Sequence, residues 1–210
     1  MINIVDNIDS TNTWLTQLNN DFFDSIISLE QSKGYGRLGS FWESEIGGLY
    51  YSVVLPYKKI LPIIIGVAVS DVLVKYNINI RLKWPNDILV DGKKLGGILC
   101  QSQGKSAIIG LGINVSNNPN FSESINLSDL GCNLDKLNFI DSLSKKISVV
   151  MGWKEQKVID KFSTYDCLIG RHVSWSEGKG RVERISEEGH LVIRNTNNKV
   201  VFLTEEVHLE

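Results

Sequence analysis

Residues 81–101 have the sequence RLKWPNDILVDGKKLGGILCQ, which predicts extended segments joined by tight turns. Leu82 and Trp84 flank Lys83 in the alternating pattern of a half-buried strand. Pro85 has no backbone N–H and restricts the residue before it, so this strand is expected to end there. Lys83 is therefore placed on a rigid strand between two large apolar residues, where its ammonium group can meet a negatively charged ligand.

The second half of the stretch predicts a β-hairpin. The dipeptide Asp91-Gly92 is a strong turn signal, and Gly96-Gly97 lets the backbone come close to a ligand. Lys94 follows the turn and adds a second ammonium group, so an anionic substrate, carboxylate or phosphate, is indicated. A surface hairpin with solvated lysines is the alternative, and it suits Lys93 and Lys94 better than Lys83.

The composition is that of a folded protein with 210 residues, enough for one full domain and a small second one. The formal net charge is −2, so the overall field gives no reason to expect nucleic acid as a partner. The most apolar run, residues 60–74, contains Pro62 and is too short to span a bilayer. No secretory leader opens the chain, and Cys100, Cys132 and Cys167 have no metal-binding spacing. We therefore expect a cytoplasmic protein with no membrane segment.

All three histidines, His172, His190 and His208, lie near the end of the chain, and residues 1–171 contain none. A Ser–His or Cys–His couple and a histidine-rich zinc site are thereby excluded from the larger part of the chain. Chemistry there has to rely on lysine, arginine, carboxylates, backbone amides or a metal ion.

Two segments before residue 40 can face a ligand. Residues 2–8 predict a strand, and Ser10 or Thr11 can cap a helix whose N-terminus meets a polar group, although a plain cap is the simpler interpretation. Residues 34–39 (GYGRLG) formally match a dinucleotide fingerprint, but no helix pattern and no acidic residue follow at the required distance. We interpret this stretch as a flexible loop that carries Arg37 and can close over a ligand.

The remaining pattern alternates between helices and strands. Residues 61–76 predict a buried helix, residues 138–162 a second helix, and residues 106–115 a buried strand. Gly110 and Gly112 in that strand allow a flat or phosphorylated group to approach, or else mark a bulge.

From about Leu168 the chain changes to short alternating segments with regular turns, which predicts a small five-strand barrel. The chain is accordingly divided into residues 1–167 and residues 168–210. The histidines of the second part are expected at the surface or in packing.

Five motifs together resemble those of the biotin–protein ligases, in order and spacing, over almost the whole chain. The most specific of them is KWPNDI at residues 83–88. The other four are Ser10-Thr11-Asn12, Gln31 with GYGRLG at 34–39 and Trp42, KLGGIL at 94–99, and GLGINV at 110–115.

The resemblance implies an α/β fold: a mixed β-sheet ligase domain of the biotin/lipoate protein ligase type and a small C-terminal SH3-like β-barrel. It also implies the reaction. The carboxylate of biotin attacks the α-phosphorus of ATP to give biotinyl-5'-adenylate and pyrophosphate, and a lysine of a biotin carboxyl carrier protein, an acetyl-CoA carboxylase subunit, then takes the biotin. Mg²⁺ is expected with the ATP, and no metal-ligating side chain is implied. The nucleophile is already anionic, which suits a segment without histidine.

The resemblance further implies the site. Lys83 and Arg37 are expected to act in catalysis. The residues expected to bind biotin are Ser10, Thr11, Asn12, Gln31, Gly34, Tyr35, Gly36, Arg37, Lys83, Gly110 and Gly112, and those expected to bind ATP are Arg37, Ser40, Trp42, Asn86, Lys94 and Asn114.

This chain departs from the family pattern in two ways. Tyr35 and Ser40 stand where the loop usually has its first and last arginines, so Lys94 is expected to supply more of the phosphate contact. The N-terminal winged helix-turn-helix of the family's repressors is absent, so a monofunctional form without DNA binding is expected.

Two alternatives stay open. One is a lipoate or octanoate ligase or transferase of related fold; a transferase would need a reactive cysteine, and Cys100 is the one near the motifs, although its apolar flank favours a core residue. The other is a module that binds biotinyl-adenylate without turnover.

Overall fold

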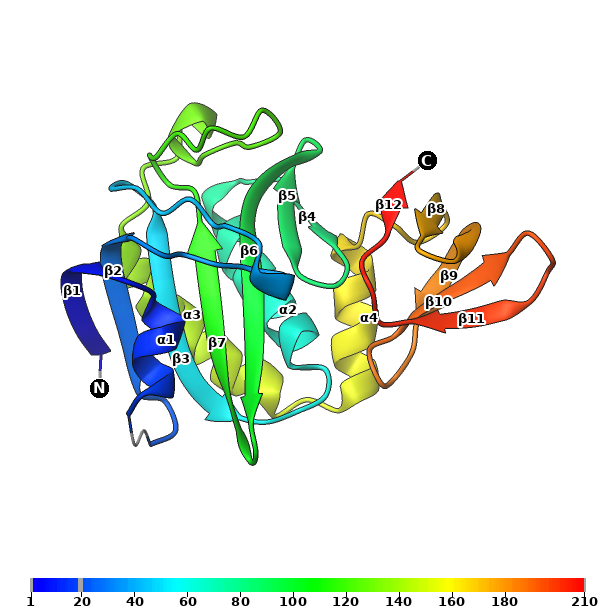
Figure 1. Ribbon diagram of the computed structural model, residues 1–210, viewed down its shortest axis with the longest axis horizontal. Coiled ribbons are helices and arrows are strands. Elements are labelled where there is room, and N and C mark those ends of the chain that lie inside the picture. The colour runs from blue at the N-terminus through cyan, green and yellow to red at the C-terminus, as the bar shows by residue number, and fades with distance from the viewer. Residues whose placement is uncertain (1, 19–20, 210) are drawn as a thin grey trace.

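The computed structural model describes residues 2–18 and 21–209, which form two β-sheets with helices packed around them (Figure 1). The larger sheet has the strand order β1-β2-β3-β7-β6-β5-β4, with β1 parallel to β2 and the other neighbours antiparallel. The mixed sheet predicted above is therefore confirmed. Its strands are β1 (Ile2–Ile8), β2 (Ser25–Gln31), β3 (Leu49–Pro56), β4 (Ile80–Lys83), β5 (Asp87–Val90), β6 (Lys93–Gln103) and β7 (Ser106–Ile113).

The stretch 81–101 folds as its pattern predicts. Strand β4 ends at Lys83, and the turn at residues 91–92 joins β5 to β6. Leu82 and Trp84 are buried while Lys83 between them is half-buried. The Trp84–Pro85 peptide bond is cis, which the sequence pattern did not indicate.

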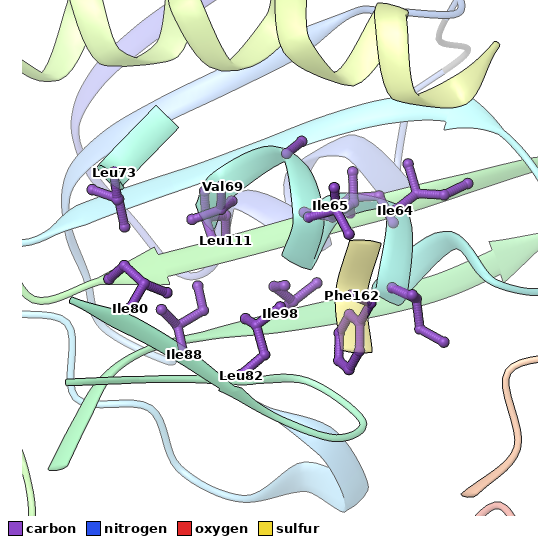
Figure 2. Close-up of a cluster of buried hydrophobic side chains, with 14 of the residues drawn as sticks. Ile64, Ile65, Val69, Leu73, Ile80, Leu82, Ile88, Ile98, Leu111 and Phe162 are labelled. Carbon is purple, nitrogen blue, oxygen red and sulfur yellow. The ribbon is translucent and has the colours of Figure 1, made fainter. Parts of the chain in front are cut away.

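The helix α2 (Leu61–Leu73) is the centre of the core and is followed by a single 3₁₀ turn, η2 (Val74–Tyr76). It is apolar nearly all round, so it is covered by the sheet on one side and by other helices on the other. Figure 2 shows side chains of α2 facing side chains of β4, β5, β6 and β7, with Phe162 beside them. The short helix α1 (Thr11–Thr16) contributes Leu15 to a separate cluster with Ile26, Val54 and Ile108. The central strands are therefore covered on both faces.

The single helix predicted over residues 138–162 is wrong, because the structure has two helices there. They are α3 (Lys136–Met151), which Asp135 caps with its side chain, and α4 (Glu155–Tyr165). The chain turns at Gly152, and Lys154 has the extended values φ −64° and ψ 144°. Both helices pack their apolar sides on α2, so one continuous apolar pattern arises from two helices that share a core.

The C-terminal part forms a five-stranded antiparallel sheet in the order β11-β10-β9-β8-β12, as the alternating pattern predicted. Its buried side chains join the same hydrophobic cluster as α2, so the division at residues 167 and 168 stays a prediction. The last strand of this sheet, residues 208–209, pairs with its first strand in chain order, residues 172–175. The strands are β8 (His172–Trp175), β9 (Gly178–Ile185), β10 (Leu191–Asn195), β11 (Val200–Leu203) and β12 (His208–Leu209).

Asp166 lies where α4 meets the second sheet. One carboxylate oxygen, Oδ1, accepts hydrogen bonds from the backbone N–H groups of Leu168 and Ile169, at 2.8 and 2.7 Å. The other, Oδ2, is buried without a hydrogen-bond partner among the described residues. Burial raises the pKa of Asp166 to about 6, against the opposing effect of those amides.

None of the helices in the described ranges combines the length and hydropathy that crossing a membrane requires.

We predict that Asp166 makes folding stability fall as the pH rises from about 4 to about 6. The folded pKa lies above the ordinary value of 3.8, so the folded chain holds the extra proton in that window and loses the advantage above it. Asp166→Asn does not titrate and keeps an acceptor for both amides. Its free energy of unfolding, relative to that of wild type, should therefore rise by up to about 3 kcal/mol between about pH 4 and pH 6. Urea unfolding at several pH values measures the difference, and parallel curves for the two proteins would contradict the prediction.

Candidate active site

The glycine loop, residues 34–42, crosses in front of β6 and β7 (Figure 1). Residues of this loop and of both strands line a cleft of about 1080 Å³. Its walls come from α1, the loop, β4 to β7, the segment after β7 and the C-terminal segment. Every predicted site residue except Gly34 lines this cleft. The lining members of that set are Ser10, Thr11, Asn12, Gln31, Tyr35, Gly36, Arg37, Ser40, Trp42, Lys83, Asn86, Lys94, Gly110, Gly112 and Asn114.

Gly34 lies behind the cleft rather than on its surface. Its carbonyl oxygen accepts a hydrogen bond from the Trp42 backbone N–H at 2.9 Å, which closes the base of the glycine loop. A Cβ atom at this position would lie 2.4 Å from Ser44 Oγ, so only glycine allows the chain to pass this closely.

Part of the cleft is lined by four uncharged hydrogen-bonding residues, Ser10, Thr11, Asn12 and Gln31, and the buried Ser52 contacts two of them. We call these five residues the neutral wall. Both the N–H and the hydroxyl of Thr11 donate to Gln31 Oε1, at 2.8 and 3.0 Å. Ser52 Oγ is fully buried and lies 2.7 Å from Thr11 Oγ1 and 2.6 Å from Asn12 Oδ1. The wall therefore presents donors and acceptors but no net charge.

The start of α1 holds this wall against the sheet. Ser10 is the N-cap, as predicted, and its Oγ accepts from the Thr13 backbone N–H at 3.4 Å. The Asn12 amide lies over Gly110, where a Cβ atom would come within 2.3 Å of Asn12 Oδ1. Glycine at position 110 therefore makes room for a side chain of the protein itself.

The indole of Trp42 lies flat against Gly112 in the same way. A Cβ atom on Gly112 would lie 2.6 Å from Trp42 Nε1, and one on the paired residue Gly97 would lie 3.6 Å from the ring. The expected approach of a flat group to these glycines is thus made by the protein's own indole. Trp42 Nε1 is buried and has no hydrogen-bond partner among the described residues.

Two cations line the cleft near β4, which is several strands away from β2 and β3 in the sheet. Lys83 ends β4 with its side chain 19% exposed, and its Nζ lies 4.0 Å from Glu206 Oε1. Arg37 reaches from the glycine loop, with Nη1 3.4 Å from Asn86 Oδ1 and Nη2 3.4 Å from the Thr204 carbonyl oxygen. Both cations therefore touch the segment that enters β12.

Lys94 is held more tightly. Its Nζ lies 2.8 Å from Asp87 Oδ1 and 5.6 Å from the centre of the Trp42 ring. Asn114 donates to the carbonyl oxygens of Lys94 and Ile125, at 3.4 and 3.2 Å, so its amide fastens the loop after β7 to the sheet.

Sequence reasoning missed several residues that line the cleft or bond to its lining residues. Two of them could have been found from the sequence, because Ser52 interrupts the apolar strand YYSVV and Asp87 lies inside the KWPNDI motif. No sequence feature points to the other three, Gln101, Glu206 and His208. Strand pairing brings Gln101 to the site, and the return of the C-terminal segment brings Glu206 and His208. His208 is exposed, as expected for a surface residue, and it also lines the cleft, which the sequence did not indicate.

The environment of Cys100 does not favour a nucleophile. Burial raises the pKa of its thiol to about 11, so it is protonated near neutral pH. No group of three His, Cys, Asp or Glu side chains among residues 2–18 and 21–209 is placed to hold a metal ion.

Comparison with known proteins identifies the family. The model of the biotin/lipoate A/B protein ligase family matches residues 5–118, more than half of the chain. The chain belongs to this family. Among its relatives, the bifunctional ligase/repressor BirA of Escherichia coli is 30% identical over 203 residues, which cover 85% of this chain and 63% of that protein. The chloroplastic biotin–protein ligase 1 of Arabidopsis thaliana is 40% identical over 103 residues, 41% of this chain and 28% of that protein.

Solved structures of the family match the whole fold. The biotin protein ligase from Aquifex aeolicus in complex with biotin and ATP has a TM-score of 0.89 and 28% identity, and the match covers 100% of this chain and 99% of that one. The larger mixed sheet followed by a small C-terminal sheet is therefore the biotin protein ligase fold. By contrast, the chain spans less than two thirds of the length of the E. coli and Arabidopsis relatives.

We predict that Gly112→Ala moves the Trp42 indole off the sheet, because the new methyl group would lie 2.6 Å from the ring. In protein labelled with 5-fluorotryptophan, the ¹⁹F resonance of Trp42, assigned with Trp42→Phe, should shift while the other tryptophans keep theirs. Gly152→Ala is the control, since a methyl group there meets its nearest atom at 3.5 Å. An unchanged Trp42 resonance in Gly112→Ala would show that the indole does not pack against Gly112.

Proposed function

We propose that the chain is an ATP-dependent biotin–protein ligase that forms biotinyl-5'-adenylate and transfers biotin to a lysine of a biotin carboxyl carrier protein. The observation that carries the proposal is one cleft that brings the uncharged groups of the neutral wall together with two cations, Lys83 and Arg37, from the other end of the sheet. The whole-chain likeness to a ligase solved with biotin and ATP supports it.

The neutral wall suits the ureido head of biotin. A buried urea needs donors and acceptors together, and an unpaired partner costs about 1–3 kcal/mol. Thr11, Asn12 and Gln31 offer both kinds of group side by side. With the head bound there, the valeryl carboxylate can extend toward Lys83. The dithiolane ring of lipoate offers no such hydrogen bonds, so the wall favours biotin over the lipoate alternative.

ATP is assigned to the opposite side of the cleft. Arg37, Lys94 and Lys83 supply positive charge for the phosphates, and the half-buried indole of Trp42, which lines the cleft, can stack on the base. Ser40, Asn86 and Asn114 line the same side. Mg²⁺ would be held mainly by phosphate oxygens and water, as is usual for nucleotide sites, since the described residues offer no carboxylate cage.

The first step brings two anions together. A carboxylate oxygen of biotin attacks the α-phosphorus of ATP, the bond to the bridging oxygen breaks, and pyrophosphate leaves. Lys83 and Arg37 reduce the repulsion between the anions and stabilise the charge that builds up on the phosphorus oxygens. No general base is needed, because the nucleophile is already deprotonated.

The second step consumes the mixed anhydride. The amine of a carrier lysine attacks the carbonyl carbon of biotinyl-adenylate, an amide bond forms, and AMP leaves. We assign chemistry to residues 1–167 and assistance in nucleotide or carrier binding to residues 168–210, whose end segment reaches Lys83 and Arg37. The three free cysteines agree with the cytoplasmic location that we propose.

The proposed function is tested by supplying ATP, magnesium and labelled biotin, lipoate or octanoate, with and without a biotin carboxyl carrier domain. We expect pyrophosphate release that depends on biotin and label on the carrier lysine. Release with lipoate or octanoate instead would favour the related ligases. Binding of biotinyl-adenylate without any release would favour a module that has lost turnover.

We predict that Lys83→Ala lowers the rate of biotin-dependent pyrophosphate release roughly a hundred- to a thousandfold, the usual effect of removing one such electrostatic contact. Lys83→Arg should rescue it poorly, because a planar guanidinium does not replace a compact ammonium group in a tight site. The matched control is Lys93→Ala, which removes an exposed lysine that does not line the cleft. If Lys83→Ala behaves like Lys93→Ala, Lys83 has no catalytic role.

A further inference from the structure

Tyr35, which lines the cleft, and Gln101 join three parts of the chain beside the neutral wall. The Tyr35 hydroxyl, from the glycine loop, donates to Gln101 Oε1 on β6 at 3.0 Å. Asn12 Nδ2, from α1, donates to the same oxygen at 2.8 Å. Thr13 Oγ1 lies 3.4 Å from the Tyr35 hydroxyl and completes the set. One amide oxygen therefore holds both the loop and the helix against the sheet.

These bonds continue into the wall itself. Asn12 is 3% exposed, and its other amide atom, Oδ1, lies 2.6 Å from Ser52 Oγ, which in turn lies 2.7 Å from Thr11 Oγ1. Tyr35 and Gln101 are half-buried while Asn12 and Ser52 are buried, so a donor of Asn12 left without its acceptor is costly. Loss of the Gln101 acceptor would leave Asn12 Nδ2 unpaired and free the Tyr35 hydroxyl at the same time.

We propose that Tyr35 and Gln101 form an uncharged clasp that positions Asn12 and the first half of the glycine loop for the head group of biotin. The inference rests on the proposed function, and it adds two positioning residues to that site. Tyr35 stands where the resembling ligases have an arginine, so this chain holds the loop at that point through a neutral bond and leaves Arg37 to face the anions.

The clasp acts on one substrate more than on the other. Tyr35 and Gln101 reach the wall through Asn12, whereas Arg37 contacts Asn86 and the segment beside Lys83. Breaking the clasp should therefore raise the KM for biotin and leave the KM for ATP and the kcat nearly unchanged. A residue that merely stabilised the fold would not separate these constants.

The test compares Tyr35→Phe, Gln101→Met and the double variant with wild type in biotin-dependent pyrophosphate release. We expect about a tenfold rise in the KM for biotin in Tyr35→Phe, equal to about 1.4 kcal/mol, and a larger rise in Gln101→Met, which also leaves Asn12 Nδ2 unpaired. The double variant should show no further rise beyond Gln101→Met. Gln103→Met is the matched control, because Gln103 is exposed and lies two residues further along the same face of β6.

A second readout needs no substrate. Amide hydrogen exchange of the ligand-free proteins should rise about threefold or more at Gly34 to Gly36 in Tyr35→Phe and in Gln101→Met, and stay at the wild-type level in Gln103→Met. Urea unfolding shows whether each variant is folded.

Three results would overturn the clasp: a KM for biotin within twofold of wild type in Tyr35→Phe, effects that add in the double variant, or an equal rise in the KM for ATP. Unchanged exchange at Gly34 to Gly36 would overturn it as well. A wild-type protein that releases no pyrophosphate with biotin overturns the proposed function instead, so the two failures are distinguishable.

Discussion

The burial of α2 against the seven-stranded sheet is the constraint on which the rest of the molecule depends. A helix that is apolar nearly all round has to be covered on every side, and the sheet, α3 and α4 together provide the cover. Side chains alternate along a strand, so Ile109, Leu111 and Ile113 of β7 join this core while Gly110 and Gly112 between them face the opposite side of the sheet. The cleft therefore forms on the face that α2 leaves uncovered.

The two glycines then decide what that face can hold. Because neither has a side chain, the Asn12 amide and the Trp42 indole lie directly on the backbone of β7. Asn12 becomes part of the neutral wall, and Trp42 packs the end of the glycine loop against the sheet. The missing side chains of Gly110 and Gly112 therefore allow both Asn12 and Trp42 to take their places in the cleft lining.

The separation of charge across the cleft is what makes the proposed chemistry plausible without histidine. In the proposed function the neutral wall holds an uncharged head group, and Lys83 and Arg37 neutralise the two anions that react. Their contacts with Glu206 and the Thr204 carbonyl oxygen show that the C-terminal segment shares this side of the cleft. Charge neutralisation and alignment, rather than proton transfer, are what an attack by a carboxylate on a phosphate requires.

The sequence by itself determined the local elements and most of the candidate site. The strand that ends at Lys83, the hairpin turn after β5, the Ser10 cap and the glycine loop follow from residue types and spacing, because backbone preferences are local. The tertiary structure alone decided the break between α3 and α4, since two helices that share a core show one apolar pattern. It alone also brought Gln101 to Tyr35 and Asn12, and Glu206 and His208 to the cleft. Those contacts join residues far apart in the chain, and only the pairing of strands and the packing around α2 set their distances.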